Sequence, residues 1–569
     1  MSQNGIGDTP FAYEAFLVNV PGSKAVAKVS CHWRLPEPVG NVDGQRYFYS
    51  LDLLMLIEIV ACGNNINEIV VPYATGTVLE NLVHACYKVQ KASGINQVEQ
   101  AVKVILVPSN GYLCRTDVLE LRMRNSAFVG SVIRFPAPSD GHFSLVAAAE
   151  TGKCNFLTLL SSAPGALLAK QSLTSHPEAF AVLEEELRVR LSFNWVLPTK
   201  PKIRKVALIG GRPVFDIHKV IRPSRNVRGS PSLRNDFVAV DMTNDTELPL
   251  RIAEALKGKG IHGIVTFSDE VVVATAKAAE ILGLPTESPQ AILCAHNKYE
   301  TRKLLDTNNT QTQTLRLESA AQLDDPPVAM KVAYMQYPLI VKPCRDGASR
   351  GVRKVNNYAG MRQAVQQLEE SGFSKYGILL ETYIDGPEVD ANFVLWEGEV
   401  LFCEISDELP CQVDAMDATI SDNFAETIML LPSRLDPKET QLIQSSLHQS
   451  LLKLGFRSGV FHVEARVRNS SMRYIQTDGI LDLADAAPST AEKAKPDVFL
   501  IEVNARPPGL QCVFATTYTY GVDFYGLQFL RAPEDRERFM ALSRAFSCHA
   551  QYWCASNDSY PPPKHHSTQ

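Results

Sequence analysis

Apolar and polar positions alternate in two different rhythms through the middle of the chain. Short apolar runs at residues 205–209 and 263–267 predict β-strands, whereas residues 248–258 and 270–282 repeat their apolar side chains at helical spacing. Strands and helices in this order are typical of a parallel sheet with crossover helices. The pattern therefore predicts a small parallel α/β domain over residues 203–295.

A second unit begins near residue 296. Four further apolar runs predict strands, at residues 337–341, 377–381, 460–466 and 498–503. The first two flank a loop that contains glycine. Between the last two, residues 469–497 are rich in Ser, Thr, Lys, Asp and Pro, a composition that does not bury a core. We expect this stretch to be a mobile surface insertion without chemistry of its own.

The N-terminal region is less informative. Short β-rich runs and helical stretches are mixed there, at residues 11–20, 80–92, 141–148 and 177–190. They indicate an α/β extension of unknown role over residues 1–200. The LPTKPK sequence that ends this region combines prolines with lysines and is typical of a linker. At the other end, residues 546–569 are expected to form a tail whose last part, SYPPPKHHSTQ, is disordered.

The composition excludes several classes of protein. Apolar residues make up 45% of the 569 residues and charged residues 21%, which is typical of a globular protein. The net charge is -6, so we expect no nucleic-acid partner. The longest mostly apolar run, residues 51–62, falls short of the ~20 residues that a membrane span needs. Because the 12 cysteines include no C-x-x-C pair, we expect reduced thiols and a cytoplasmic protein without membrane contact.

The LIEVNARPPG segment near the C-terminus is the most specific in the chain. Alternate side chains of a strand share one face, so Glu502 and Asn504 point the same way. In the neighbouring predicted strand, FHVEAR, Glu464 lies among apolar residues and should be partly buried. A buried carboxylate needs compensation, either from a salt bridge to Arg466 or Arg506 or from divalent cations. Three oxygen ligands on two strand ends favour the metal.

Lys342 lies directly at the end of an apolar strand, which is unusual for a core residue and natural for a phosphate ligand. The loop at residues 346–351 includes Gly347 and Ser349, and its backbone N–H groups can approach an anion closely. On its own, such a loop is usually a plain hairpin turn. It is not a Walker A sequence, because no Gly-Lys-Ser/Thr ends it. Its position after Lys342 favours phosphate binding.

Two acids accompany the predicted strand at residues 377–381. Glu381 ends that strand, and Glu388 follows a turn at Asp385-Gly386-Pro387. A solvated surface charge is the usual interpretation of a glutamate. Because both acids follow a buried strand, they are also candidates to accept hydrogen bonds from a base amine and from ribose hydroxyls.

Taken in order, these features resemble the ATP-grasp superfamily of carboxylate–amine ligases, over residues 203–530. The resemblance is carried by Lys298 with Arg302, Lys342 with its glycine loop, Glu381 and Glu388, Glu464, and the Glu502-x-Asn504-x-Arg506 sequence. It implies an ATP-grasp fold, in which two α+β lobes clamp ATP, at residues 296–380 and 381–545, preceded by the small α/β domain. The chain looks most like the amino-acid ligase and carnosine synthase group, which also carries a long N-terminal region.

The resemblance also implies ligands. Those of ATP would be Lys298, Lys342, Gly347 and Ser349 near the phosphates, Glu381 at the adenine amine, the backbone of Tyr383 and Ile384 at the hinge, and Glu388 at the ribose. Those of two Mg²⁺ ions, with Mn²⁺ as an alternative, would be Glu464, Glu502 and Asn504, with Glu502 bridging. No protein nucleophile is needed for this chemistry.

The implied reaction joins a small-molecule carboxylate, an amino acid in this group, to an amine and releases ADP and phosphate. The carboxylate attacks the γ-phosphate with the help of Mg²⁺ and Lys342, and an acyl phosphate forms. Arg506 would stabilise the oxyanion when the amine attacks. The family's Arg-x-Gly-Gly ending is Arg-Pro-Pro-Gly here, and Pro508 lacks the backbone N–H that glycine would offer. Arg506 or the N–H of Gly509 would then act alone.

Substrate recognition is less specific. Glu426 and Asp407, which precede the LPS sequence at residues 431–433, are candidates to bind a substrate ammonium, and a surface loop is the alternative. Two other functions stay open, an ATP-grasp small-molecule kinase and a non-catalytic nucleotide-binding scaffold. Trapping of an acyl phosphate by hydroxylamine would separate ligase from kinase. We expect small-molecule partners and allow for a homodimer.

Overall fold

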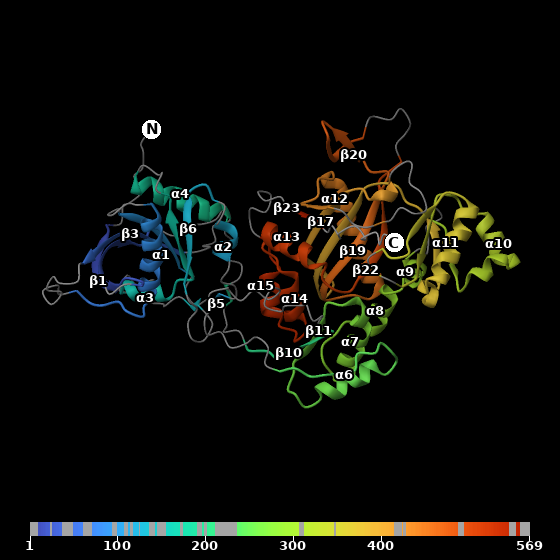
Figure 1. Cartoon of the computed structure of the whole chain (residues 1–569), viewed down its shortest axis with the longest axis horizontal. Coiled ribbons are helices and arrows are strands. Elements are labelled where there is room, and N and C mark those ends of the chain that lie inside the picture. Colours follow the sequence, from blue (N-terminus) through green and yellow to red (C-terminus); the bar gives the residue numbers. More distant parts are fainter. Residues whose placement is uncertain are drawn as a thin grey trace, which may run out of the picture. The chain divides into compact units, whose positions relative to one another are not determined.

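The computed structural model describes residues 10–22, 25–36, 49–60, 71–93, 99–106, 112–113, 118–123, 126–135, 143–144, 155–170, 175–190, 196–197, 202–210, 236–305, 312–345, 347, 349–414, 424, 428–486, 494–545 and 554–557. These residues form two units, coloured along the sequence in Figure 1. The first takes in the described residues up to Ile203, with Arg544 and Ala545. The second takes in those from Arg204 to Ser543, with residues 554–557.

Antiparallel strands build the first unit. Its main sheet has the order β1-β2-β3-β4-β8-β6, and a short sheet has the order β7-β5-β9. The strands are β1 (Ala12–Asn19), β2 (Val26–Arg34), β3 (Tyr49–Val60), β4 (Gln100–Leu106), β5 (Tyr112–Leu113), β6 (Val129–Arg134), β7 (Phe143–Ser144), β8 (Gly165–Ala169) and β9 (Val196–Leu197). Every pair within these sheets is antiparallel. The unit is therefore α+β, which corrects the expected α/β extension.

Helices cover both faces of the main sheet. They are α1 (Val78–Ser93), α2 (Val118–Met123), α3 (Phe156–Ser161) and α4 (His176–Arg190). Leu82 of α1 and Phe156 of α3 belong to the large core on one face, and Phe180 of α4 packs with Ala101 on the other. Helices α1, α3 and α4 thus bury their apolar stripes against the sheet, as amphipathic helices require.

Charged side chains are buried between β3, β4 and α4. Lys103 and Asp52 are opposite each other in register, and Lys103 Nζ lies 2.7 Å from Asp52 Oδ1. Lys103 also forms an ion pair with Glu184 of α4, and Arg34 Nε lies 3.0 Å from Asp52 Oδ2. We call these four residues the N-terminal ion cluster. Two cations and two carboxylates balance each other, as burial of charge demands.

The second unit begins with the small α/β domain. Strand β10 (Val206–Ile209) pairs in parallel with β11 (Gly263–Thr266), and α6 (Leu248–Leu256) and α7 (Asp269–Ile281) pack beside them. The parallel pairing and both helices confirm the sequence prediction. Helix α8 (Pro289–Ala295) follows and leads to α9 (Lys298–Leu305).

A four-stranded antiparallel sheet forms the small lobe. Its order is β12-β15-β13-β14. The strands are β12 (Thr314–Leu317), β13 (Leu339–Pro343), β14 (Arg353–Val355) and β15 (Ile378–Thr382). Helices α10 (Pro326–Ala333) and α11 (Tyr358–Glu370) pack on it, with Met361, Val365 and Leu368 in the shared core. The glycine loop joins β13 to β14 in an antiparallel pair, whereas the sequence prediction placed it between β13 and β15 and contained no strand at residues 353–355.

The large lobe is built on a six-stranded antiparallel sheet of order β22-β19-β16-β17-β18-β23. Its strands are β16 (Glu388–Trp396), β17 (Glu399–Glu408), β18 (Ile428–Leu431), β19 (Gly459–Arg468), β22 (Asp497–Asn504) and β23 (Cys554–Asn557), and its helices are α12 (Pro437–Leu454), α13 (Leu510–Tyr520), α14 (Phe524–Arg531) and α15 (Arg536–Leu542). Val389, Phe393 and Val463 pack against Leu447 of α12 on one face. The alternate positions face the other side and carry polar residues.

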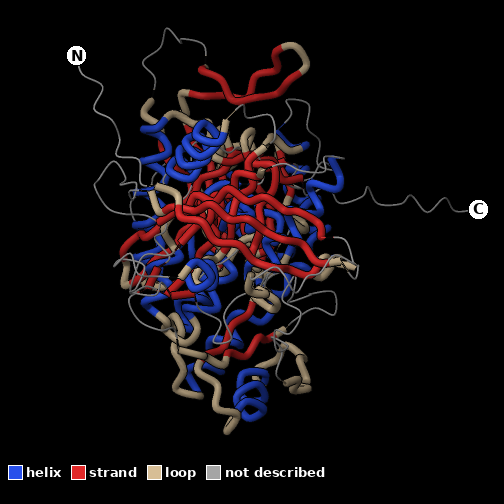
Figure 2. The backbone as a smooth tube through the Cα atoms, turned by 90° about the vertical axis from the view of Figure 1, so that its left-hand side faces the viewer, coloured by secondary structure: helices blue, strands red, loops and turns tan. Residues whose placement is uncertain are grey.

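Two details of the large lobe differ from the expectation. Within residues 469–497, β20 (Met472–Thr477) and β21 (Ile480–Asp485) form an antiparallel hairpin, which stands out in Figures 1 and 2. Leu483 is 1% exposed in the lobe's core, and the Tyr474 hydroxyl donates to the Glu408 carbonyl at 2.6 Å. Strand β23 lies within the expected tail and pairs with β18. The sequence SYPPPKHHSTQ lies outside the described residues.

Among the helices that the structure describes, none combines the length and the apolar character that a membrane crossing requires. Helix α12, 18 residues long, has charged residues at both ends and buries only one side.

Candidate active site

Two rows of polar side chains cross the large sheet on the face opposite α12. Each row takes one residue from β16, β19 and β22, in direct register across the strands. The rows are Asp390–Glu464–Glu502 and Asn392–His462–Asn504. Because alternate side chains of a strand share a face, both rows lie on one side of the sheet. The structure thus brings together the three residues expected to bind metal.

Cationic groups from other elements reach these rows. Lys298, the first residue of α9, places its Nζ 2.8 Å from Glu502 Oε2. Arg506, just after β22, makes two hydrogen bonds of 2.6 Å to the carboxylate of Asp269, the first residue of α7. Burial alone would lower the pKa of Arg506, but Asp269 outweighs it and raises that pKa. The small α/β domain therefore contributes a carboxylate to the site of the large lobe.

The residues present fit a magnesium site in their chemistry. Glu464, Glu502 and Asn504 offer two carboxylates and one amide oxygen, which are the ligands that Mg²⁺ takes. Among the described residues, no group of three or more His, Cys, Asp or Glu side chains is arranged to hold an ion. The candidate set contains only two such residues, so substrate phosphate and water would complete the coordination. In this structure the ammonium group of Lys298 compensates the negative charge of Glu502.

Lys342, Glu381 and Arg302 form a second cluster of buried charge, which we call the small-lobe ion cluster. Lys342 in β13 forms an ion pair with Glu381 in β15, and Arg302 Nε lies 3.3 Å from Glu381 Oε2. Burial alone would raise the pKa of Glu381, but Lys342 and Arg302 together lower it below its ordinary value. Arg302 also donates to the Leu500 carbonyl at 2.7 Å, so α9 connects the small lobe to β22.

The glycine loop turns tightly after β13. Ser349 has a φ of 51° and Gly351 a φ of 73°, both in the left-handed region. The positive φ of Gly351 favours glycine, and a Cβ there would also displace the end of the Leu368 side chain, whose Cδ2 would be 2.5 Å away. The Gly347 carbonyl accepts from the Arg350 backbone N–H at 3.4 Å. Asp346 and Ala348 lie outside the described residues.

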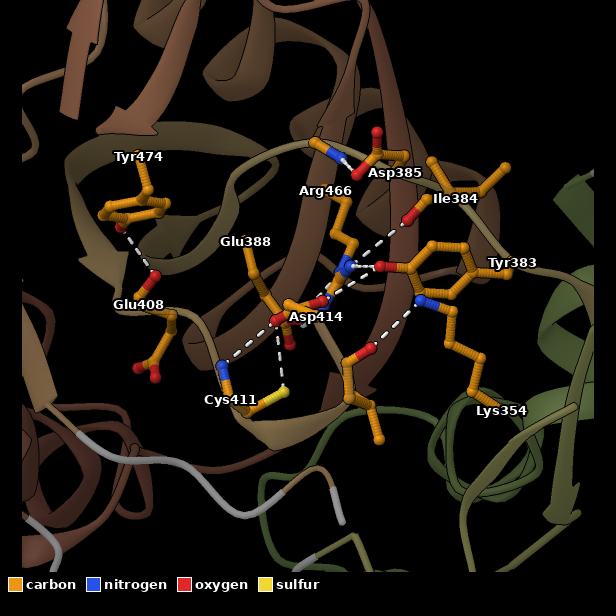
Figure 3. Close-up of polar contacts among 12 residues, drawn as sticks. Lys354, Tyr383, Ile384, Asp385, Glu388, Glu408, Cys411, Asp414, Arg466 and Tyr474 are labelled. Atoms are coloured by element: carbon orange, nitrogen blue, oxygen red, sulfur yellow. Dashed lines mark hydrogen bonds and ion pairs between the residues drawn. The ribbon is translucent and has the colours of Figure 1, made fainter. Parts of the chain in front are cut away.

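The expected hinge and ribose residues meet at one arginine (Figure 3). Arg466 donates to Glu388 Oε2 through Nε at 2.8 Å and Nη2 at 2.6 Å. Arg466 Nη1 donates to the Ile384 carbonyl at 3.3 Å and to the Tyr383 hydroxyl at 2.9 Å. The backbone N–H of Tyr383 donates to the Pro338 carbonyl at 3.0 Å. The hinge is thus fixed from both lobes.

Of the two residues expected to bind a substrate ammonium, the one that the structure describes, Asp407, is not brought to the polar rows. Asp407 of β17 pairs in register with Val389, which faces the core side of the sheet. Its carboxylate accepts from the Ser433 hydroxyl at 2.5 Å and from the Arg434 N–H at 2.7 Å. It therefore stabilises the turn after β18. Glu426 lies outside the described residues.

A chain of buried polar side chains leads into the second row and was missed by the sequence interpretation. Glu404 Oε1 accepts from Asn392 Nδ2 at 2.9 Å, and Asn392 Oδ1 lies 3.0 Å from His462 Nδ1. His462 Nε2 is 3.7 Å from Glu464 Oε1. Burial raises the pKa of Glu404 to about 7 and lowers that of His462 to about 3. The chain carries no charged ammonium or guanidinium group.

Asp269, Asp390 and His296 were also missed. His296, whose pKa is lowered mainly by burial, lies close enough to Asp269, Lys298 and Glu502 to feel their charges. One signal for Asp269 was available, because it follows the carboxyl end of a parallel strand, where α/β domains place their sites. Asp390 was detectable as an acid in an apolar strand, two residues after Glu388.

Comparisons with known proteins identify the family of this chain. The ATP-grasp domain matches residues 335–481, and the ATP-grasp N-terminal domain matches residues 220–286. The ATP-grasp enzyme fsqD of Aspergillus fumigatus is 33% identical over 485 residues, 80% of this chain and 82% of that protein. Human carnosine synthase 1 is 26% identical over 262 residues, 42% of this chain but only 30% of that protein. A crystal structure of an L-amino acid ligase from Bacillus licheniformis, 21% identical, aligns over 52% of this chain and 64% of that one with a TM-score of 0.39.

Proposed function

The chain belongs to the ATP-grasp family, and from this premise we propose that it is an ATP-dependent carboxylate–amine ligase. The reaction joins a small-molecule carboxylate to an amine through an acyl phosphate, and it releases ADP and phosphate. The observation that carries the proposal is the register of β19 and β22, which sets Glu464 opposite Glu502 with Asn504 one row away. Lys298 and Arg506 supply positive charge on the same face.

The nucleotide ligands of the proposal come from both lobes. Lys342 and the glycine loop with Gly347 and Ser349 would contact phosphates. Lys298 would also contact them once Glu502 binds metal and releases its ion pair with Lys298. Bound at Glu464, Glu502 and Asn504, two Mg²⁺ ions, or Mn²⁺ in their place, would neutralise phosphate charge and polarise the γ-phosphate. Tyr383, Ile384 and Glu388 would hold the base and the ribose.

Glu381 takes a modified role in this proposal. Both its oxygens are used by Lys342 and Arg302, and the side chain is 2% exposed. A carboxylate in that position fixes Lys342 near the end of β13, where it would contact the phosphates of a bound nucleotide. Contact of Glu381 with the adenine amine, which the family resemblance implies, would require one of these pairs to open.

The chain's own residues then account for the two chemical steps. The substrate carboxylate attacks the γ-phosphorus and the bond to the ADP oxygen breaks, while Lys342 and Lys298 compensate the phosphate charge. The amine next attacks the acyl carbonyl, and phosphate leaves after the tetrahedral intermediate. The guanidinium of Arg506 would stabilise the oxyanion of that intermediate. For this, Arg506 would give up one of its two hydrogen bonds to Asp269 and donate that hydrogen bond to the oxyanion instead.

We further propose that at least one substrate is an amino acid. The support is the similarity to carnosine synthase 1, whose name states the synthesis of carnosine, although the match covers a minor part of that protein. Asp269 and the acids of the two rows offer partners for an ammonium group. Asp407 is not included, because it faces the other side of the sheet.

Product analysis tests the proposal. Full-length protein, Mg-ATP and pairwise combinations of amino acids and amines are incubated, and the nucleotides are separated by chromatography. We expect release of ADP and phosphate that depends on both members of one pair. Stoichiometric AMP with pyrophosphate would overturn the mechanism. Hydroxylamine added without the amine should give a hydroxamate, whereas a phosphorylated alcohol and no hydroxamate would identify a kinase.

A further inference from the structure

Arg466 of β19 is surrounded by groups that belong to three different parts of the chain (Figure 3). Besides Glu388 and the hinge residues Tyr383 and Ile384, its guanidinium meets Asp414, with Nη2 2.8 Å from Asp414 Oδ1. The arginine is 4% exposed. Burial alone would lower its pKa, but Glu388, Asp414 and Tyr383 raise it well above the ordinary value. Arg466 is therefore a permanently charged centre for this group.

Asp414 ties a separate segment to this arginine. It ends the 3₁₀ turn Gln412–Asp414, which follows β17. Its Oδ1 accepts from the Tyr383 hydroxyl at 3.0 Å, and its Oδ2 accepts from the Cys411 backbone N–H at 3.1 Å and thiol at 3.2 Å. Despite burial, Arg466 keeps the pKa of Asp414 below its ordinary value. All described contacts of this carboxylate thus serve to fix the segment beside the hinge.

The small lobe contacts the same segment through Lys354 of β14. Lys354 Nζ donates to the Val413 carbonyl at 3.0 Å and lies 4.0 Å from the centre of the Tyr383 ring. A cation over an aromatic face at this distance is a favourable contact. The hinge tyrosine is thus held by Lys354 from one lobe and by Asp414 and Arg466 from the other.

The hydrogen bonds from Arg466 engage only one of the two carboxylate oxygens of Glu388. Both Arg466 donors go to the same oxygen, Oε2. The Glu388 side chain is 27% exposed, so it is oriented on one side and accessible on the other. The turn before it is also tight, because a Cβ on Gly386 would come 2.1 Å from the Val467 carbonyl oxygen. A carboxylate fixed in this way keeps one oxygen for a ligand with paired hydroxyls.

We propose that Arg466 is a positioning residue that orients Glu388 toward the ribose hydroxyls, and that Asp414 makes this orientation depend on the segment Gln412–Asp414. The inference rests on the proposed function, because it takes the ligand to be a ribonucleotide. In this view Arg466 contacts both Glu388, at the ribose end of the nucleotide site, and Asp414, in the segment that follows β17. A nucleotide that lacks the ribose hydroxyls cannot form hydrogen bonds with Glu388, so its affinity should not depend on Arg466.

A merely structural role would have a different signature. If Arg466 only stabilised the fold, its replacement would weaken every nucleotide equally. If it orients Glu388, replacement would weaken binding of ATP and leave binding of 2′,3′-dideoxy-ATP nearly unchanged. The ratio of the two dissociation constants is therefore the decisive quantity, and it does not depend on how much protein is folded.

The experiment measures both dissociation constants by isothermal titration calorimetry on the full chain with Mg²⁺. We expect wild-type protein to bind ATP at least about tenfold more tightly, as two hydrogen bonds to a charged group imply. Glu388→Gln and Arg466→Lys should reduce the ratio to about threefold or less. Asp414→Asn, a milder change at the edge of the cluster, should reduce it to an intermediate value.

Arg468→Lys is the matched control. Arg468 lies two positions further on the same strand and face, and it pairs with Asp497 instead. Its replacement should leave the ratio at the wild-type value. An unchanged ratio in both Arg466→Lys and Asp414→Asn would overturn the inference, and a folded wild-type protein that binds both nucleotides equally would do so too. Absence of any ATP binding would instead contradict the proposed function.

Discussion

Among the described residues, two lysines are buried next to carboxylates, one in each unit, and only one of them belongs to the candidate site. Lys103 of the N-terminal ion cluster is 2% exposed and Lys342 of the small-lobe ion cluster is 3% exposed. Lys103 shares its cluster with Arg34 and faces two carboxylates, Asp52 and Glu184. Lys342 shares one carboxylate, Glu381, with Arg302. Burial of a lysine alone therefore does not identify a site.

The difference lies in what surrounds each lysine. The N-terminal ion cluster lies beneath α4, whose Phe180 ring is 5.9 Å from Lys103 Nζ. In the small-lobe ion cluster Lys342 and Arg302 both pair with Glu381, and Lys342 lies at the end of a strand that runs into the glycine loop. A lysine in that position is suited to contact an anion such as phosphate. Substitutions at the two lysines and at the residues around them should therefore have different effects on turnover and on stability.

The largest effect is expected for Glu502→Gln, which keeps the shape of the side chain and removes its negative charge. Turnover should fall by about a thousandfold or more, roughly 4 kcal/mol in transition-state free energy, because the metal loses a charged ligand. ADP release measures it. Asp497→Asn, on the same strand but outside the site, is the control and should retain activity. Near-normal turnover of Glu502→Gln would contradict the metal assignment.

Lys103→Met tests the other side of the comparison. Removal of the lysine leaves Asp52 and Glu184 buried with less compensation, and breaking such a pair costs about 3–5 kcal/mol. Hydrogen exchange read by mass spectrometry should show faster exchange in β3 and β4. Turnover measured at a temperature where the chain is folded should change by less than about twofold. A large loss of turnover without faster exchange would give the N-terminal ion cluster a functional role.

The pH dependence of stability should separate Glu404 from the paired carboxylates. Its pKa is raised to about 7 from an ordinary 4.5, chiefly by burial, so the folded state keeps the proton that the unfolded state loses. Stability from this group is fully present below pH 4.5 and falls as the pH rises to 7, by up to about 3 kcal/mol. Glu404→Gln should lack this step. Denaturant unfolding at pH 4.5, 6 and 7.5 measures the difference between the two proteins, and parallel curves would refute it.

Lys342→Met should reduce turnover by about 10-fold to 100-fold, since a charge-assisted hydrogen bond to phosphate contributes about 1.5–3 kcal/mol. Stability should change less than in Lys103→Met, because Arg302 still compensates Glu381. Lys331→Met, an exposed lysine of the small lobe, is the matched control and should be active. If Lys342→Met were instead fully active and unstable, the two buried lysines would have the same structural role.

The smallest effect is expected at the β20–β21 hairpin. Replacing residues 476–481 by Asn-Gly shortens it and keeps the pairing of Tyr474 with Leu483. Turnover should stay within about twofold, because the removed tip contacts no residue of the candidate site among those described. Deleting residues 472–483 should destabilise the chain, since Leu483 is buried in the large-lobe core. Loss of activity in a stable tip variant would show that the hairpin contributes to the site.

Local patterns were sufficient for much of the second unit. The strands at β10, β11, β13, β15, β19 and β22 were predicted from short apolar runs, because each is buried on at least one face. The hairpin β20–β21 was missed because its exposed strands contain many polar residues. Strand β23 was missed because its partner, β18, is distant in sequence. Pairing of that kind leaves no local periodicity.

The site was predictable where one strand holds several ligands and unpredictable where distant elements supply the partners. Glu502 and Asn504 share a face because they are two residues apart in one strand. That they lie beside Glu464 was inferred because the two predicted strands were taken as neighbours in the sheet. That Asp269 would pair with Arg506 depends on how the small α/β domain packs on β22, which no local pattern encodes. The same is true of Asp414 beside Arg466.

The pairing of β18 with β23 also constrains the order in which the strands of the large sheet can assemble during synthesis. β18 ends at Leu431, whereas its outer partner begins only at Cys554. While the ribosome makes the residues in between, the backbone edge of β18 has no strand to pair with, and open edges of this kind invite association with other chains. The sheet that carries the candidate site therefore lacks its outermost strand until the chain has been made as far as Asn557, and the edge of β18 stays unpaired in the meantime.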